Sequence, residues 1–353
     1  MYLIKLVAID TMKKKLLKFL KYIMLLSVVV CLLLIFIPRT YDMPKANPRQ
    51  GTQFWELPTG SKIGYFHITA KGTKKLFPII YLQGGPGGFI SDYNIKTFTP
   101  LSENGYNIYL YDQIGSGQSA RLSNISEYTP DRHKQDLEEI FKIIGSDKVI
   151  LIGQSWGAVL ATLFIADNPN SVEKIIFTGV PSIQPMRKEL LDIKAPDSLH
   201  LKKPPYSNGE ANEKTQNIRS SAATICARAF CIKLATDKEV DDFQTYRNQE
   251  LNKATVCDTL KALEAESGGG FYAQVMTVKS FSEIKDPRTK LKDCKVPTLI
   301  MKGQCDSQPW GFVIEYLELF SNHTLKIIPD AGHSITVEQP EIYINTIRNF
   351  LKQ

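Results

Sequence analysis

Short apolar runs alternate with segments of helical periodicity along most of this chain. Five runs before residue 180 have the length and composition of β-strands (63–69, 78–82, 108–111, 149–152 and 174–178). The last four are compact and apolar, which is typical of strands buried on both faces of a sheet. Residues 130–144 lie between two of them and carry apolar side chains at helical spacing. Such alternation predicts an α/β fold, with a mostly parallel central sheet covered by helices on both sides.

This alternation stops near Pro181 and resumes about 110 residues later. Residues 182–290 are polar, rich in Lys and Glu, and contain several helical segments. Strand-like runs return at 297–301 and 324–328, and an amphipathic helix follows at 340–351. The pattern therefore predicts one α/β domain in two parts, 41–181 and 291–353, interrupted by a helical cap at 182–290.

The N-terminal residues 1–40 form a separate segment. Residues 22–37 are a run of mostly large apolar side chains without charge, and five lysines between residues 13 and 21 precede it. Lysines before an apolar span predict a membrane anchor with a cytoplasmic N-terminus and an extracytoplasmic remainder. A cleaved signal peptide, followed by secretion, is the alternative, although no Ala-x-Ala cleavage site follows the run. Met12 is a second candidate start.

The overall net charge of +7 changes meaning once it is divided along the chain. Residues 1–40 hold seven basic residues and one acidic residue, so the folded part is nearly neutral. A nearly neutral domain lacks the basic face that nucleic-acid binding requires. We therefore expect no nucleic-acid partner.

Five cysteines follow the apolar run, at positions 226, 231, 257, 294 and 305. An oxidising compartment permits one or two disulfides among them. Because Cys226, Cys231 and Cys257 lie in one region of the chain, we expect a bridge between two of these three. The alternative is that all five are reduced and buried.

The apolar run 149–152 ends in Gly153-Gln-Ser155-Trp-Gly157, and a helical pattern follows at 158–166. A strand, Gly-x-Ser-x-Gly and a helix together predict a nucleophile elbow, which lifts a serine hydroxyl out of the sheet at a helix N-terminus. The glycines are needed because a Cβ would clash with close backbone neighbours at this turn. We therefore predict that Ser155 is a catalytic nucleophile.

A serine nucleophile needs a base and an acid that orients the base. His333 follows the run 324–328, and Asp306 follows the run 297–301, so both lie where an open α/β sheet binds its ligand. Ser, Asp, His is also the chain order of such hydrolases. Asp330 is the rival acid, but it lies only three residues from His333, and His323 precedes its strand. We predict the triad Ser155, Asp306 and His333.

Two backbone N–H groups are expected to stabilise the oxyanion. One belongs to Trp156, the residue after the nucleophile. The other is assigned to Gly85, in the loop Gly84-Gly-Pro-Gly-Gly88 directly after the predicted strand 78–82. Glycines let the backbone approach a developing alkoxide closely, and each donor contributes ~3–4 kcal/mol to transition-state stabilisation. This chemistry requires no cofactor and no metal.

These motifs, together with Asp112-Gln-Ile114-Gly-Ser-Gly-Gln-Ser119, resemble the signatures of the prolyl iminopeptidase family. Members of this family are α/β-hydrolase-fold serine exopeptidases that remove an N-terminal residue, often proline. The resemblance covers roughly 50–180 and 290–353. Gln83 replaces the histidine of the family's His-Gly-Gly-Pro-Gly, and Ile114 replaces the arginine of its Asp-Gln-Arg-Gly, so the pocket is expected to differ.

The resemblance implies an aminopeptidase acting on small peptides, and the N-terminal segment adds the expectation that it is anchored in a membrane. In the family, acidic residues of the cap hold the free amino group of the substrate, and candidates here are Glu250, Glu264, Glu266 and Glu283. Candidate aromatic walls of the pocket are Phe89, Trp156, Phe271 and Trp310.

Two other functions stay open. A carboxylesterase or small-amide hydrolase, acting on another small acyl substrate, would use the same triad. A binding protein that has lost activity is disfavoured by the complete Ser, His and Asp set. Ser155 argues against epoxide hydrolases and haloalkane dehalogenases, whose nucleophile is an aspartate.

Overall fold

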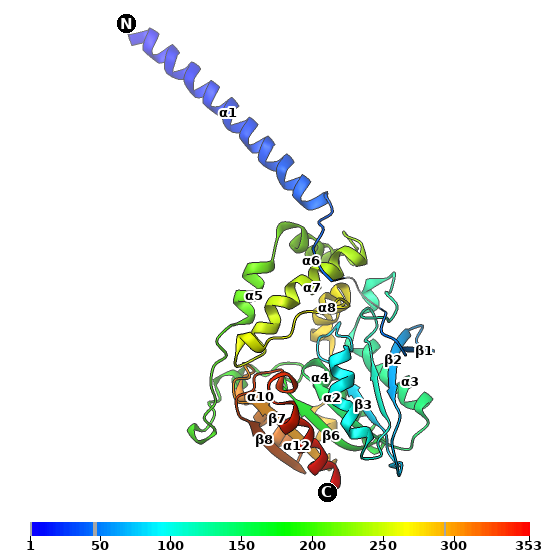
Figure 1. The fold of residues 1–353 in the computed structure, drawn as a ribbon. Coiled ribbons are helices and arrows are strands. Elements are labelled where there is room, and N and C mark those ends of the chain that lie inside the picture. The colour runs from blue at the N-terminus through cyan, green and yellow to red at the C-terminus, as the bar shows by residue number, and fades with distance from the viewer. Residues whose placement is uncertain (1, 45–47, 293) are drawn as a thin grey trace.

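The computed structural model describes residues 2–44, 48–292 and 294–353. Helix α1 (Tyr2–Phe36) projects away from a folded body that contains the remaining elements (Figure 1). An 18-residue window within its segment Met12–Phe36 has a mean hydropathy of 2.7, and none of that window is buried in the structure. The helix is long and apolar enough to cross a membrane, and an N-terminal signal sequence has the same properties.

One eight-stranded sheet organises the body within the described residues, in the order β1-β2-β4-β3-β5-β6-β7-β8. β2 pairs antiparallel with β1 and β4, whereas all pairs from β4 to β8 are parallel. The strands are β1 (Gln53–Glu56), β2 (Lys62–Ile68), β3 (Ile79–Leu82), β4 (Ile108–Tyr111), β5 (Val149–Gln154), β6 (Val172–Thr178), β7 (Thr298–Gly303) and β8 (His323–Ile328). The prediction of a mostly parallel sheet is confirmed.

Helices cover both faces of this sheet. α2 (Asp92–Ser102) and α12 (Pro340–Lys352) pack on one face, with α11 (Ile335–Glu338) before α12, while α3 (Pro130–Ile144), α4 (Trp156–Asp167) and α10 (Trp310–Leu319) pack on the other. Alternate strand residues point to opposite faces, so Ile79 and Tyr81 belong to one apolar core while Ile80 and Leu82 belong to the other. The sheet is therefore buried on both sides, as its continuous apolar strands require.

The boundaries of α3 illustrate how local sequence sets an element. Thr129 is its N-cap, with the hydroxyl accepting a hydrogen bond from the N–H of Arg132, and Pro130 occupies the first turn. Gly145 ends the helix in the left-handed conformation, with φ 67°. These are favoured start and stop residues, which explains why the predicted range 130–144 matches the observed helix.

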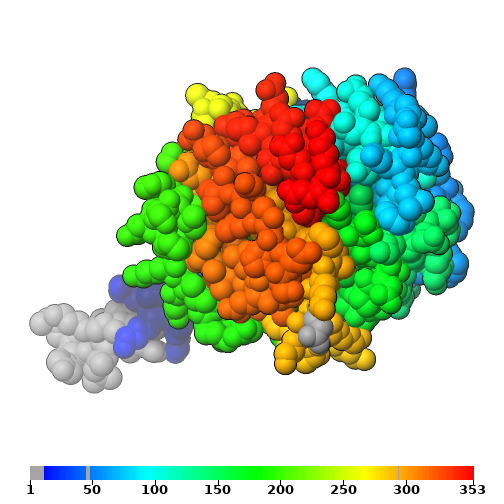
Figure 2. Space-filling view, turned by 90° about the horizontal axis from the view of Figure 1, so that it is seen from below, coloured from blue at the N-terminus to red at the C-terminus, as the bar shows by residue number. Residues whose placement is uncertain are grey.

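Helices, with no strand among the described residues, fill the chain between β6 and β7. They are α5 (Asn208–Thr215), α6 (Ile218–Phe230), α7 (Asp237–Lys253), α8 (Phe271–Lys279) and α9 (Arg288–Leu291), with short 3₁₀ turns between them. We call residues 182–290 the insertion. α6, α7 and α8 lie at the end of the body from which α1 leaves (Figure 1). The view from the opposite end shows the C-terminal segments, coloured orange and red, with α1 projecting beyond the outline (Figure 2).

The sequence pattern missed the strand β1 and the helices α2, α10 and α11. Residues 38–55 read as a polar linker, yet their end enters β1, where only Trp55 is buried. α2 has few apolar residues and contains Pro100. Neither segment has the periodicity on which the prediction depends.

Candidate active site

Ser155 lies in the sharp turn between β5 and α4. Its backbone has φ 51° and ψ −119°, a conformation that residues with a side chain rarely adopt and that marks local strain. The flanking glycines make the turn possible: a Cβ added to Gly157 would lie 2.0 Å from the carbonyl oxygen of Leu82, and one added to Gly153 would lie 2.6 Å from that of Gly157. The elbow geometry predicted from the sequence is therefore present.

The predicted base and acid meet at the carboxyl ends of two neighbouring strands. His333 follows β8 and Asp306 follows β7, and the Nδ1 atom of His333 lies 3.0 Å from Oδ1 of Asp306. Asp306 is buried and also accepts the N–H of Gln308 at 3.1 Å. Burial alone would raise the pKa of Asp306, but His333, Lys302 and the Gln308 amide together outweigh it and hold that pKa below its ordinary value. The carboxylate is thus kept ionised beside the imidazole.

Lys302 is a charged neighbour of this pair that the sequence reading did not identify. Its side chain is buried at the end of β7, with Nζ 3.4 Å from Oδ2 of Asp306. The same ammonium donates to the carbonyl oxygens of Asp306 and Gln308 at 3.1 and 2.8 Å. Burial lowers the pKa of Lys302. A single lysine inside an apolar strand, four residues before the predicted acid, was the available signal.

The other candidates for the acid and the base lie away from the pair of Asp306 and His333. Asp330 is exposed and its carboxylate pairs with Lys202 at 3.2 Å. His323 is exposed, with Nδ1 2.7 Å from the carbonyl oxygen of Phe320. His133 is buried against Thr277, and burial lowers its pKa to about 4. The structure therefore brings together Asp306 and His333 and none of these alternatives.

The glycine-rich loop after β3 packs against the elbow. A Cβ added to Gly84 would lie 3.4 Å from the Cβ of Ser155. Gln113 holds the loop, since its Nε2 donates to the carbonyl oxygens of Gln83 and Gly84 at 2.9 Å each and its Oε1 accepts the N–H of Gly87 at 2.9 Å. Gly85 has φ 131°, which favours glycine. The predicted oxyanion donors, the amides of Gly85 and Trp156, therefore belong to two adjoining and firmly held turns.

The two departures from the family signatures have distinct surroundings. The Nε2 of Gln83 donates to the carbonyl oxygen of Phe89 at 3.0 Å, so this side chain braces the glycine-rich loop. Ile114 is buried in the apolar core. The cation beside the buried Asp112 is Arg49, at 3.0 Å, from the segment before β1.

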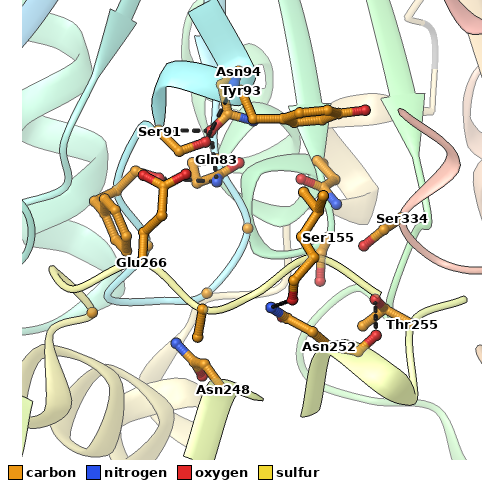
Figure 3. A pocket seen from close by; sticks show the side chains of 18 of the residues that line it. Gln83, Ser91, Tyr93, Asn94, Ser155, Asn248, Asn252, Thr255, Glu266 and Ser334 are labelled. Atoms are coloured by element: carbon orange, nitrogen blue, oxygen red, sulfur yellow. Dashed lines mark hydrogen bonds between the residues drawn. The ribbon is translucent and has the colours of Figure 1, made fainter. Parts of the chain in front are cut away.

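A pocket of about 300 Å³ opens above Ser155. Ser155, His333 and the loop 84–88 line one side, and residues of the insertion line the other. Asn248 and Asn252 project from α7 across the pocket from Tyr93 and Asn94 of α2 (Figure 3). The walls from α7 are thus neutral amides.

Two of the four candidate cap carboxylates, Glu264 and Glu266, line this pocket. The side chain of Glu266 is exposed, yet desolvation by the protein around it and the nearby Asp92 raise its pKa. Glu250 accepts from Tyr206 at 2.8 Å and pairs with Lys253 at 2.6 Å, and Glu283 is exposed away from the pocket lining. Glu264 and Glu266 are therefore the acidic residues within reach of a bound ligand.

The expectation for the aromatic walls was largely wrong. Phe89 lines the pocket, whereas Trp156, Phe271 and Trp310 are buried in the core. The indole of Trp156 stacks on Phe281 with ring centroids 5.3 Å apart. A side chain next to the nucleophile in sequence points below the elbow because successive residues at a strand-to-helix turn face different directions.

The cysteine pairing also differs from the expectation. Cys257 bonds to Cys305, with their Cα atoms 5.4 Å apart, while Cys226, Cys231 and Cys294 are free. The 17-residue helix α7 separates Cys231 from Cys257, a length of about 25 Å, so proximity in sequence misled the prediction. The bond joins the insertion to the residue before Asp306.

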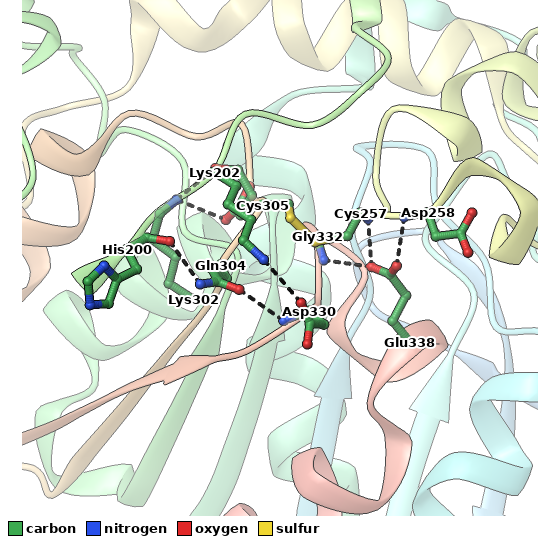
Figure 4. The surroundings of a disulfide bond; sticks show 11 residues. His200, Lys202, Cys257, Asp258, Lys302, Gln304, Cys305, Asp330, Gly332 and Glu338 are labelled. Atoms are coloured by element: carbon green, nitrogen blue, oxygen red, sulfur yellow. Dashed lines mark hydrogen bonds and ion pairs between the residues drawn. A yellow bond between two sulfur atoms is a disulfide. The ribbon is translucent and has the colours of Figure 1, made fainter. Parts of the chain in front are cut away.

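Glu338 reinforces that junction (Figure 4). Its carboxylate accepts the N–H groups of Cys257 and Asp258 at 2.8 and 3.0 Å and that of Gly332 at 2.7 Å. Gly332 precedes His333, so one buried carboxylate ties the insertion to the loop that carries the base. Among the residues from 12 onward whose side chains are described, no cluster of His, Cys, Asp and Glu could hold a metal ion.

A serine in an elbow, beside a histidine that contacts a buried aspartate at the carboxyl edge of a parallel sheet, defines the class of α/β hydrolases. The sequence profile of the alpha/beta hydrolase fold family matches residues 78–340, and this chain belongs to that family.

The individual relatives include hydrolases of more than one activity. The chain is 25% identical to the proline iminopeptidase of Heyndrickxia coagulans over 304 residues, covering 83% of this chain and 96% of that protein. It is 22% identical to epoxide hydrolase 1 of Caenorhabditis elegans, covering 81% of this chain and 68% of that protein. The solved proline iminopeptidase of Mycobacterium smegmatis superposes with a TM-score of 0.55 at 18% identity, covering 86% of this chain and 98% of that one. The resemblance to proline iminopeptidases predicted from the motifs is confirmed.

Proposed function

We propose that this protein is a membrane-anchored serine aminopeptidase of proline iminopeptidase type, which releases N-terminal residues from small peptides. The observation that carries the proposal is the contact of 3.0 Å between His333 and Asp306 at the edge of the pocket where Ser155 occupies its elbow. Neutral imidazole held in this way accepts a proton on its other nitrogen.

In the proposed reaction, Ser155 Oγ attacks the carbonyl carbon of the substrate while His333 takes the hydroxyl proton. Asp306 holds the imidazole and stabilises the imidazolium that forms. The N–H groups of Gly85 and Trp156 donate to the oxyanion. The tetrahedral intermediate expels the amine, which receives its proton from His333, and water then hydrolyses the acyl-enzyme by the same route.

The aminopeptidase assignment rests on Glu264 and Glu266 at the pocket mouth. A carboxylate in desolvated surroundings gains from a cation beside it, and the free ammonium of a peptide supplies one. A bound ammonium would therefore oppose the desolvation and the charge of Asp92 that raise the pKa of Glu266.

A small-acyl esterase or amide hydrolase is the second candidate, and the neutral walls favour it. Asn248, Asn252 and Gln244 from the insertion can bond a carbonyl or hydroxyl without requiring a charged substrate. A substrate without an amino group would leave Glu264 and Glu266 unused.

Matched substrates separate the two candidates. Prolyl and alanyl p-nitroanilides are compared with their N-acetylated forms and with p-nitrophenyl acetate. The aminopeptidase cleaves the free amines, and Glu264→Gln or Glu266→Gln raises KM for these amides about tenfold or more while leaving ester cleavage unchanged. Glu250→Gln is the control outside the pocket. Equal rates for free and acetylated amides, or cleavage of esters alone, would refute the aminopeptidase.

A fluorophosphonate probe tests the nucleophile, since it should label the wild type and not Ser155→Ala. The anchor is tested by N-terminal sequencing of protein extracted from membranes. An N-terminus before residue 22 supports an uncleaved anchor, and one after residue 37 establishes the cleaved alternative. The disulfide supports an oxidising, extracytoplasmic location for the body.

A further inference from the structure

The free face of helix α6 is apolar along its whole length. Ile218, Ile225 and Ile232 are 46%, 60% and 58% exposed, and Phe230 is 67% exposed. Ile218, Ala222, Ile225 and Ala229 recur at intervals of four and three, which places them on one side of α6. Ile232 comes directly after Cys231, the residue that caps the helix. We call these five residues and Phe230 the α6 patch. Exposed apolar groups gathered in this way indicate a contact surface.

The opposite side of α6 is already occupied. Ala223 and Ala227 are fully buried, and α6 packs against α8. The helix therefore has two apolar sides, of which the protein covers one. Core packing explains the buried side and leaves the α6 patch unexplained.

The end of α1 lies against the start of α6. Arg219, in the first turn of α6, donates a hydrogen bond from Nη1 to the carbonyl oxygen of Ile35, in the last turn of α1. Arg219 is held by Glu239, with its Nε 2.8 Å from Oε1, and both side chains are only 8% exposed. Glu239 also accepts the N–H of Arg39 at 3.0 Å. The C-terminal end of α1 and the residues just after it are thus held to α6 by the buried ion pair of Arg219 and Glu239.

We propose that the α6 patch lies in the interface of the lipid bilayer that α1 spans, so that the insertion rests on the membrane. The proposal rests on the membrane anchor proposed above. The contact with Ile35 places the first turn of α6 at the membrane surface, because Phe36 ends the apolar helix one residue later. α6 also lies at the end of the body from which α1 leaves (Figure 1).

The chemistry of the patch fits lipid. Interfacial helices bury an apolar face at the boundary of headgroups and acyl chains and carry basic residues beside it. Arg228 is exposed next to the patch, and Lys233 follows it. A phenylalanine at the end of the helix supplies the large apolar group that such interfaces favour.

Tryptophan probes test the contact in the full chain, reconstituted in vesicles of phosphatidylcholine brominated near the headgroup, which quenches tryptophan on contact. The three native tryptophans are at most 9% exposed, so lipid should quench them little, and the emission of the wild type serves as the reference. Phe230→Trp reports on the patch and Val29→Trp on the anchor. Leu76→Trp is the exposed control, because residue 76 precedes β3 and so lies at the amino ends of the parallel strands, whereas the pocket lies at their carboxyl ends.

The expected result is that brominated lipid at least halves the emission that Phe230→Trp and Val29→Trp add to the wild-type signal and leaves the emission added by Leu76→Trp unchanged. Adding Ile225→Ser and Ile232→Ser to Phe230→Trp should relieve the quenching. Quenching of Val29→Trp without quenching of Phe230→Trp would overturn the lipid contact of the α6 patch and would support the anchor. Quenching of neither would overturn both. A blue shift of Phe230→Trp that depends on protein density, without quenching, would show that a second copy covers the face and would overturn the lipid contact.

Discussion

The bond between Cys257 and Cys305 makes a quantitative prediction about stability. It closes a loop with a sequence separation of 48 residues. The chain-entropy estimate for a loop of this length gives about 4 kcal/mol at 25 °C. For the roughly 300 residues that follow α1, the entropy of unfolding is about 0.6 kcal/mol per degree, so the Tm should fall by about 6 °C when the bond is removed.

The perturbation is the double variant Cys257→Ser/Cys305→Ser, measured by urea and thermal unfolding of the full chain in one detergent. Cys226→Ser/Cys231→Ser is the matched control, because both of these sulfurs are free. We also expect kcat/KM to fall about tenfold, since Cys305 adjoins Asp306. Dithiothreitol should produce the same losses in the wild type. A double variant that unfolds within a degree of the control and keeps full activity would refute the reasoning.

Three further predictions follow from charge and close contact. Lys302→Met should lower kcat/KM about tenfold. It should also raise the pH at which acid destabilises the protein, because the stability that comes from the depressed pKa of Asp306 is lost as pH falls through that pKa. Exposed Lys326→Met is the control in pH–rate and urea measurements, and identical profiles for the two variants would exclude a role for Lys302. Burial raises the pKa of Asp241 to about 6, so stability should fall, by on the order of 2 kcal/mol, as pH rises from 4 to 6.5. Asp241→Asn should remove that slope in urea titrations, and an unchanged slope would contradict it. Gly157→Ala should reduce kcat/KM at least about a hundredfold, because the new Cβ would lie 2.0 Å from the carbonyl oxygen of Leu82. Gly209→Ala is the control and should be neutral, because its Cβ would meet only Ser207 Oγ, at 3.6 Å. A near-normal rate for Gly157→Ala would show that the turn can relax.

The sheet and the three residues proposed for catalysis were accessible from sequence for one physical reason. Parallel strands buried on both faces are continuous apolar runs, and their carboxyl ends share an edge. Ser155, Asp306 and His333 each follow such a run, so their order and spacing sufficed to select them from several serines, acids and histidines.

The supports of the site could not be found in this way. Glu338 is meaningful only through what it contacts, because its partners Cys257 and Asp258 lie in the insertion. Lys302 contacts Asp306 four residues later, so its place inside an apolar strand was the one signal in the sequence. The disulfide depends on how α7 carries Cys257 back over the sheet. Contacts made by a helical insertion follow from tertiary packing, which hydrophobic periodicity does not encode.

The segment 255–258 joins substrate binding to the proposed catalytic machinery. Thr255 and Val256 line the pocket. The carbonyl oxygen of Thr255 accepts the N–H of Ser334 at 2.9 Å, next to His333. Cys257 binds the residue before Asp306, and Glu338 joins Cys257 to the loop of His333.

Base and acid are therefore both positioned by a piece of the pocket wall. Substitutions in 255–258 should change kcat together with KM, since a small displacement of the triad is costly. Changes at the side chains of Asn248 and Asn252, which line the pocket from α7, should change KM alone. Substitutions on α7 can thus change which substrates bind, whereas residues 255–258 are constrained because they also position the proposed base and acid.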